Sequence, residues 1–270
     1  ARIDDAEKRG ELKEELVLLE ATSGHTGIAL AAIGRSKGYE VGIMMPESMS
    51  VGRRKIIAGF GAKLTLTAAA EGMSGAVARA KELVQKNPGK YYMPDQFSNS
   101  ANPAIHILTT APEIEIDTGG KIHAVVAGVG TGGTISGVGS YFRMMRQMDV
   151  AMVAVEPAGS PVITQKMAGE ELRPAPHKIQ GIGAGFIPLI LDLSVINHVI
   201  TVEDDEAVQT ARMIMKDAGI FCGISGGAAV AGAIKALKTG KINSEKKTDF
   251  TVVVILPDSG ERYLSTGLYE

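Results

Sequence analysis

The segment Ala124–Gly137, AVVAGVGTGGTISG, indicates the fold of this chain. Its first residues are small or β-branched and apolar, as in a buried strand that ends at Gly128, and the start of a helix follows. Backbone N–H groups and the positive end of a helix dipole together bind anions, most often a phosphate. We therefore expect a phosphorylated ligand at the tight turn and helix start formed by Gly130, Thr131, Gly132, Gly133 and Thr134.

Length and composition are those of a soluble globular protein. The chain has 270 residues, of which 45% are hydrophobic, enough for one large or two modest domains. The formal net charge of -2 gives no electrostatic reason to expect a nucleic acid or an anionic membrane as partner. No apolar run approaches the roughly 20 residues that a membrane span needs, and the charged N-terminal residues are not a signal peptide.

The cysteine and histidine content argues against a disulfide-bonded protein and against a metal-binding one. The single cysteine, Cys222, excludes an intrachain disulfide and fits a reducing cytoplasm. The five histidines are scattered, so no cluster has the spacing of metal ligands, and we expect no metal site.

Strand-like and helix-like segments alternate along the chain. Continuous Val, Ile and Leu strands separated by helices are typical of parallel sheets covered on both faces, so we predict an α/β protein. The Pro- and Gly-rich stretch 173–188 is long for a loop, which favours a functional or mobile segment. The predicted strands are 16–19, 42–45, 63–67, 90–93, 122–127, 151–155, 198–202 and 250–256. The predicted helices are 28–37, 50–60, 73–85, 102–116, 136–148, 204–218 and 227–237.

The glycine-rich turn leaves two functions open. Residues 128–133 satisfy G-x-G-x-x-G after a strand, and Glu156 ends the next strand, as in a dinucleotide site whose acid binds the ribose. Against this, two hydroxyl residues suit a monophosphate. A second loop, Thr22–Gly27, also joins a strand to a helix and would bind a second anion. One phosphate site and one carboxylate site favour an enzyme that acts on an amino acid with a phosphorylated cofactor over a nicotinamide dehydrogenase.

Further segments occur in a characteristic order. They are EATSGHTG at 20–27, MPESMS at 45–50, QFSN at 96–99 with NP at 102–103, GVGTGGT at 128–134, HKIQGIGAGFIP at 177–188, CGIS at 222–225 and LPDSGERYLST at 256–266. In these motifs the chain resembles the cysteine synthases (O-acetylserine sulfhydrylases) from about Asp5 to its C-terminus. Several ordered motifs are more specific than any single loop.

The resemblance implies the fold type II pyridoxal-phosphate architecture, like that of the tryptophan synthase β subunit. This is two three-layer αβα domains with mainly parallel sheets, and the N-terminal strands of the larger domain would be absent from this chain. We expect residues 1–99 to form the smaller domain, with the substrate-carboxylate loop. Residues 100–270 would form the larger domain, with the phosphate loop.

The resemblance also implies roles for individual residues. The phosphate of pyridoxal 5'-phosphate would bind to Gly130, Thr131, Gly132, Gly133 and Thr134. The substrate α-carboxylate would bind to Thr22, Ser23, Gly24 and Thr26, helped by Gln96. Ser225 would face the pyridine nitrogen, where a neutral hydroxyl makes the ring a weaker electron sink and suits β-elimination over transamination.

Three of these residues have alternative interpretations. Ser225 would also serve as the N-cap of the helix 227–237. Gln96, taken alone, would be a solvated loop residue. His25 stands where the family has Asn, which would reach the phenolic oxygen of the cofactor. The bulkier His ring would shift the pKa of the aldimine or change the nucleophile or substrate preference, unless the substitution is simply tolerated with a slightly altered cofactor tilt. An unchanged spectrum and pH profile in His25→Asn would argue against an effect.

The lysine on which the family's chemistry depends has no counterpart here. It forms the Schiff base with the cofactor and moves the α-proton, and it lies in a Ser-Val-Lys-Asp-Arg-like segment. No lysine of this chain has that context, so we assign no catalytic residue. By resemblance the segment would precede Ala1. We expect a fragment of a longer gene product, in preference to a shortened paralogue.

The function implied is cysteine biosynthesis by β-replacement, in which O-acetylserine and sulfide give cysteine and acetate through an aminoacrylate. One alternative is a cystathionine β-synthase-like enzyme that uses a thiol amino acid. Another is a non-catalytic paralogue without the Schiff-base lysine, which would bind pyridoxal phosphate or a peptide. Implied partners are a second copy of the chain in a homodimer and the C-terminal tail of a serine acetyltransferase, in the cytoplasm.

Overall fold

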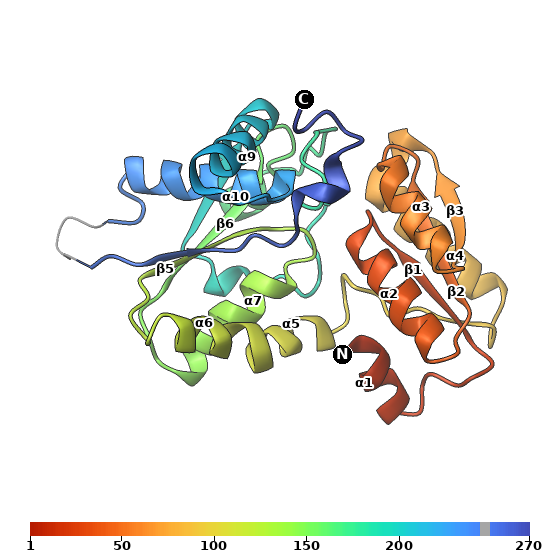
Figure 1. The fold of residues 1–270 in the computed structure, drawn as a ribbon. Helices are drawn as coiled ribbons and strands as arrows, with labels where there is room; N and C mark the ends of the chain where they lie inside the picture. Colours follow the sequence, from red (N-terminus) through yellow and green to blue (C-terminus); the bar gives the residue numbers. More distant parts are fainter. Residues whose placement is uncertain (244–248) are drawn as a thin grey trace. The chain divides into compact units, whose positions relative to one another are not determined.

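The computed structural model describes residues 1–243 and 249–270 and shows an α/β protein with two parallel sheets (Figure 1). The chain divides into two compact units, Ala1–Ala101 and Asn102–Glu270. Each unit contains one of the four-stranded sheets. The predicted fold class is confirmed.

The first unit is a parallel sheet of order β3-β2-β1-β4 with helices on both faces. Successive residues of a strand point to opposite faces. Leu18 and Ile43 pack with the side chains of α2 and α3, whereas Leu19 and Met44 pack with α4. The elements are α1 (Arg2–Lys8), β1 (Val17–Ala21), α2 (His25–Ser36), β2 (Val41–Pro46), α3 (Val51–Gly59), β3 (Lys63–Thr67), α4 (Gly72–Lys86) and β4 (Tyr91–Tyr92).

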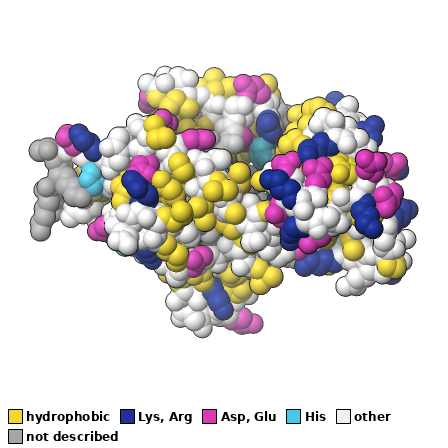
Figure 2. All heavy atoms as spheres, turned by 90° about the horizontal axis from the view of Figure 1, so that it is seen from below, with side chains coloured by type: hydrophobic (Ala, Val, Ile, Leu, Met, Phe, Trp, Pro, Cys, Tyr) yellow, Lys and Arg dark blue, Asp and Glu magenta, His cyan; other side chains and the backbone are white. Residues whose placement is uncertain are grey.

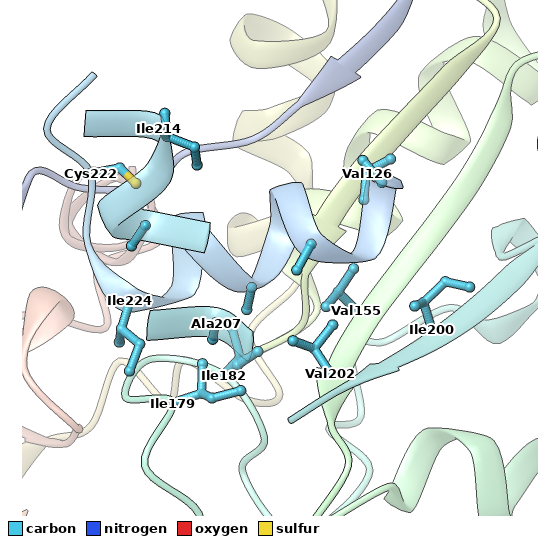
Figure 3. Close-up of a cluster of buried hydrophobic side chains, with 14 of the residues drawn as sticks. Val126, Val155, Ile179, Ile182, Ile200, Val202, Ala207, Ile214, Cys222 and Ile224 are labelled. Atoms are coloured by element: carbon cyan, nitrogen blue, oxygen red, sulfur yellow. The ribbon is translucent and has the colours of Figure 1, made fainter. Parts of the chain in front are cut away.

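The second unit is a parallel sheet of order β7-β6-β5-β8, again covered on both faces. Val126 and Val155 belong to the cluster that packs against α9 and α10, part of which Figure 3 shows, and Val125 to the cluster around α7. The strands are β5 (Ala124–Gly128), β6 (Ala151–Pro157), β7 (His198–Val202) and β8 (Val252–Val254). The helices are α5 (Ala101–Ile105), α6 (Ala111–Asp117), α7 (Gly133–Ser140), α8 (Val162–Ala168), α9 (Asp204–Ala218) and α10 (Ile224–Lys238).

Three helices begin three residues earlier than the sequence predicts. Their N-caps are Gly24, Gly132 and Gly223, which have no side chain that could mark a helix start in the sequence. The prediction that Ser225 is an N-cap is therefore wrong, because Gly223 holds that position and Ser225 lies within the first turn of α10.

Other differences concern the regularity of the helices. The predicted helices 102–116 and 136–148 each contain a π-helical turn, His106–Thr110 and Tyr141–Met145. Helix α8 was not predicted, and the last predicted strand, 250–256, is shortened to β8.

None of the helices formed by residues 1–243 and 249–270 has the length and apolar character of a membrane-spanning helix.

Candidate active site

The turn between β5 and α7 has the geometry of an anion site. Strand β5 ends at Gly128, and the N-cap Gly132 has a φ of 86°, a left-handed conformation that favours glycine. Helix α7 starts at Gly133, so the backbone N–H groups of its first turn have no partner within the helix. The predicted strand, turn and helix start are all present.

Crowding around the turn explains its glycines. A Cβ atom on Gly130 would lie 2.5 Å from the backbone carbonyl oxygen of Gly181. One on Gly133 would lie 2.1 Å from Oδ1 of Asn102. Without side chains, the backbone forms a small cradle at the positive end of α7. The residues present therefore fit a phosphate group.

Two hydroxyl groups border this cradle, and each has a polar neighbour. Asn102 Nδ2 donates to Thr131 Oγ1 at 3.0 Å, so the Thr131 hydroxyl can direct its own hydrogen at a phosphate oxygen. Thr134 Oγ1 lies 3.3 Å from Nε2 of His106, a histidine whose pKa is lowered by burial. Sequence reasoning missed His106, because a lone histidine in a helix gives no signal of its neighbours.

The long segment 177–188 connects the phosphate turn to Ser225. Gly183 N donates to the carbonyl of Val129 at 3.0 Å. Gly181 lies close to both the phosphate turn and Ser225. Its carbonyl oxygen would be 2.5 Å from a Cβ added to Gly130, and a Cβ added to Gly181 itself would lie 3.8 Å from Ser225 Oγ. Ser225 is 2% exposed at the start of α10. The phosphate-turn residues and Ser225 are thus brought together in the second unit.

The loop after β1 brings together the residues predicted for the substrate carboxylate. Thr22 Oγ1 accepts a hydrogen bond from the Gly24 N–H at 3.0 Å, which folds the loop into a tight turn. Gly24 has a φ of 150° and is the N-cap of α2, so His25 and Thr26 occupy the first helical turn. Ser23 and His25 are half-buried.

Gln96 is part of this group in the first unit. Its Nε2 donates to the carbonyl of Ala21 at 2.6 Å, and its Oε1 accepts from the Thr26 hydroxyl at 2.7 Å. The carbonyl of Ala21 can only accept, so the amide has one orientation. Gln96 is 5% exposed, which rules out the interpretation as a solvated loop residue.

Glu20 lies directly before the loop and is completely buried. Its Oε2 accepts from Arg2 Nη1 at 2.8 Å and from the Gln96 N–H at 3.2 Å, and its Oε1 accepts from the Ala21 N–H at 3.1 Å. Burial raises the pKa of Glu20 to about 7, although Arg2 opposes that shift. Sequence reasoning did not single out this residue.

The raised pKa of Glu20 predicts a pH-dependent stability. In the unfolded chain the carboxyl loses its proton near pH 4.5, but in the folded protein only near pH 7. This contribution to stability is therefore fully present below pH 4.5 and is lost as the pH rises to about 7. We expect the free energy of unfolding, relative to Glu20→Gln, to fall by on the order of 3 kcal/mol across this range. Urea unfolding at pH 4.5 and 8 measures it, and a constant difference would contradict the prediction.

Arg53 on α3 supports the same loop and was also missed. It is completely buried, and its Nη1 donates to the Ser23 carbonyl at 3.2 Å. Its aliphatic part packs on Gly24, where an added Cβ would lie 2.4 Å from Arg53 Cδ. Arginines in a short helix are normally exposed, so the sequence VGRRKIIAG does not indicate that Arg53 is buried.

Glu156 argues against the dinucleotide alternative. The carboxylate is 1% exposed and accepts from the N–H groups of Ile163 and Thr164, both at 2.8 Å, and from the Thr164 hydroxyl at 2.6 Å. These bonds provide acceptors for N–H groups in the first turn of α8, which have none within the helix. Because the acid that would bind a ribose is used to hold a helix, the structure favours a monophosphate at the turn.

We expect Glu156→Ala to destabilise the protein by about 2–3 kcal/mol, because it leaves buried N–H groups of α8 without an acceptor. Thermal unfolding measures the loss. Glu170→Ala, at an exposed glutamate soon after α8, is the matched control and should have little effect. Equal stability of the two variants would show that the Glu156 bonds contribute nothing.

Comparisons with known proteins show the family of the chain. The family model described as "Pyridoxal-phosphate dependent enzyme" matches residues 2–258. Cysteine synthase A of Escherichia coli (strain K12) is 53% identical over 266 residues, covering 98% of this chain and 81% of that protein.

Two solved structures show the same architecture. O-acetyl serine sulfhydrylase isoform 3 of Entamoeba histolytica has a TM-score of 0.86 and 44% identity, over 99% of this chain and 76% of that one. The O-acetylserine dependent cystathionine beta-synthase of Helicobacter pylori has a TM-score of 0.87 and 35% identity, over 100% of this chain and 83% of that one.

Proposed function

The chain belongs to the pyridoxal-phosphate dependent enzyme family, and within it we propose a cysteine synthase that converts O-acetylserine and sulfide to cysteine and acetate. The observation that carries this function is the 53% identity to a cysteine synthase over 98% of the chain. Its cofactor is pyridoxal 5'-phosphate.

For the cofactor, we propose a site in the second unit. Bound there, it would supply an electron sink for breaking the Cα–H and Cβ–O bonds of the substrate. The turn from Gly130 to Thr134 would bind its phosphate through the N–H groups of α7 and the two threonine hydroxyls. Ser225 would bind the pyridine nitrogen with a neutral hydroxyl. The glycine cradle and the buried position of Ser225 support these roles.

For the substrate carboxylate, we propose the loop Thr22–Thr26 together with Gln96. The Thr26 hydroxyl donates to Gln96, so a carboxylate would take its first hydrogen bonds from the Ser23 hydroxyl and the N–H groups of the first turn of α2. His25 begins this helix and is proposed to contact the cofactor's phenolic oxygen. The buried Arg53 beneath the loop adds a favourable positive potential.

The nucleophile distinguishes this function from its nearest alternative. The Helicobacter pylori cystathionine beta-synthase is 35% identical, a weaker match than the cysteine synthases. We therefore expect the natural gene product, loaded with pyridoxal phosphate and O-acetylserine, to prefer sulfide when sulfide and homocysteine compete. Product analysis by mass spectrometry decides this. Cystathionine as the main product would favour the alternative.

A homodimer in the cytoplasm is also proposed. Hydrophobic side chains gather on the face of the second unit that Figure 2 shows. Among the exposed hydrophobic residues of this unit, Leu108, Ile116 and Met145 are 72%, 77% and 63% exposed. Patches of this kind mark protein interfaces. Light scattering should give twice the monomer mass.

We also propose that the C-terminal tail of a serine acetyltransferase binds the carboxylate loop. A peptide with the sequence of that tail should then compete with O-acetylserine.

A further inference from the structure

Glu20 is a buried acid that the proposed reaction does not use. It is the penultimate residue of β1, and the loop Thr22–Thr26 begins two residues later. Three donors converge on its carboxyl group from three parts of the first unit: the side chain of Arg2, the N–H of Gln96 and the N–H of Ala21.

The hydrogen bonds around Glu20 favour a carboxylate, whereas its burial favours the neutral acid. Both oxygens accept from N–H groups, so protonation of the carboxyl group weakens it as an acceptor for these donors. The charged groups that face Glu20 are Arg2 on α1, which favours its ionisation, and Asp95, which opposes it. Lys81 of α4 lies 3.9 Å from Asp95. Since the pKa of Glu20 is about 7, both forms are populated near neutral pH.

The hydrogen bonds continue from Glu20 to the loop. The Gln96 N–H binds Glu20 at 3.2 Å, which fixes the backbone of Gln96. Its side chain then binds the Ala21 carbonyl at 2.6 Å and the Thr26 hydroxyl at 2.7 Å. A change at the carboxyl group therefore reaches the first turn of α2 through a single residue.

We propose that ionised Glu20 is a positioning residue that holds Gln96, and through it Thr26, in the geometry that binds the substrate α-carboxylate. The inference rests on the proposed function of the loop Thr22–Thr26. Glu20 itself does not touch the substrate. Protonation weakens the acceptor for Gln96, so the affinity for the amino acid falls with it.

The experiment measures the binding of L-serine, which lacks the acetyl leaving group, to the natural gene product loaded with pyridoxal phosphate. Binding is followed by the change in cofactor absorbance between pH 5.5 and 8.5. Glu20→Gln should bind about tenfold more weakly than wild type at pH 8, the effect of one charge-assisted hydrogen bond. The ratio of the two affinities should approach one at acidic pH, with a midpoint near pH 7. Ionisation of the serine amine cancels in this ratio.

Two further variants separate positioning from a general structural effect. Arg2→Gln removes the charge that lowers the pKa of Glu20, so the midpoint should move to higher pH. This outcome also tests the proposal if Glu20→Gln fails to fold. Glu40→Gln, at an exposed glutamate that pairs with Lys63, is the matched control and should bind as wild type does.

Failure of the inference is distinguishable from failure of the proposed function. If Ser23→Ala, Thr26→Val and Gln96→Ala all bind serine normally, the assignment of the loop to the carboxylate is wrong. If Thr26→Val and Gln96→Ala bind weakly while Glu20→Gln keeps the affinity and the pH profile of wild type, the role of Glu20 alone is overturned. An unmoved midpoint in Arg2→Gln overturns it as well.

Discussion

Gly130→Ala is expected to weaken the binding of pyridoxal phosphate by at least about a hundredfold. The new Cβ would lie 2.5 Å from the backbone carbonyl oxygen of Gly181. A backbone atom cannot rotate away as a side chain can, so either the turn or the segment 177–188 must shift. The N–H groups of α7 would then no longer converge on the phosphate. Equilibrium titration with pyridoxal phosphate, followed by absorbance, measures the loss.

The control for this variant is Gly159→Ala in the same unit. Its Cβ would be 3.5 Å from the carbonyl of Pro176, an ordinary van der Waals contact. Its affinity for pyridoxal phosphate should stay within about twofold of wild type. A Gly130→Ala protein that binds the cofactor as tightly as Gly159→Ala would show that the turn does not hold the phosphate.

Gly24→Ala is expected to have the second largest effect, on the carboxylate loop. Gly24 has a φ of 150°, which an alanine adopts only with strain, and the Cβ would lie 2.4 Å from Arg53 Cδ. Arg53 is completely buried, so its side chain has no solvent to move into. We expect a loss of about 2–4 kcal/mol in stability and about a hundredfold weaker binding of L-serine.

Gly59→Ala is the matched control in the first unit. Gly59 ends α3, and an added Cβ would have no heavy atom within 4 Å. This variant should keep both its stability and its affinity for serine, as measured by urea unfolding and by the absorbance titration. If Gly24→Ala behaves like Gly59→Ala, the close packing of Arg53 on the loop affects neither the stability of the protein nor its affinity for serine.

The strands and the phosphate turn could be predicted because their signals are local. An apolar run ended by glycine marks β5 and one ended by proline marks β2, and the parallel sheets follow from the alternation of such runs with helices. The helix starts at Gly24, Gly132 and Gly223 escaped prediction, since a glycine N-cap carries no side-chain signal. The π-helical turns escaped because a single wider turn does not alter the apolar pattern enough to be seen.

The polar interior of the first unit could not be predicted, because it depends on contacts between distant residues. Glu20 meets Arg2, 18 positions before it, and the Gln96 N–H, 76 positions after it. Nothing local distinguishes a buried glutamate or arginine from an exposed one. The role of Glu156 was likewise open in the sequence, since a ribose ligand and an acceptor for a following helix are both carboxylates at a strand end.

Cysteine formation by the natural gene product tests the central claim most directly. The protein is supplied with O-acetylserine and sulfide, and cysteine and acetate are quantified with and without pyridoxal phosphate. We predict that the two products appear in equal amounts, that removal of the cofactor stops their formation and that its return restores it. Acetate release without cysteine, or cysteine formation that does not depend on pyridoxal phosphate, would contradict the account.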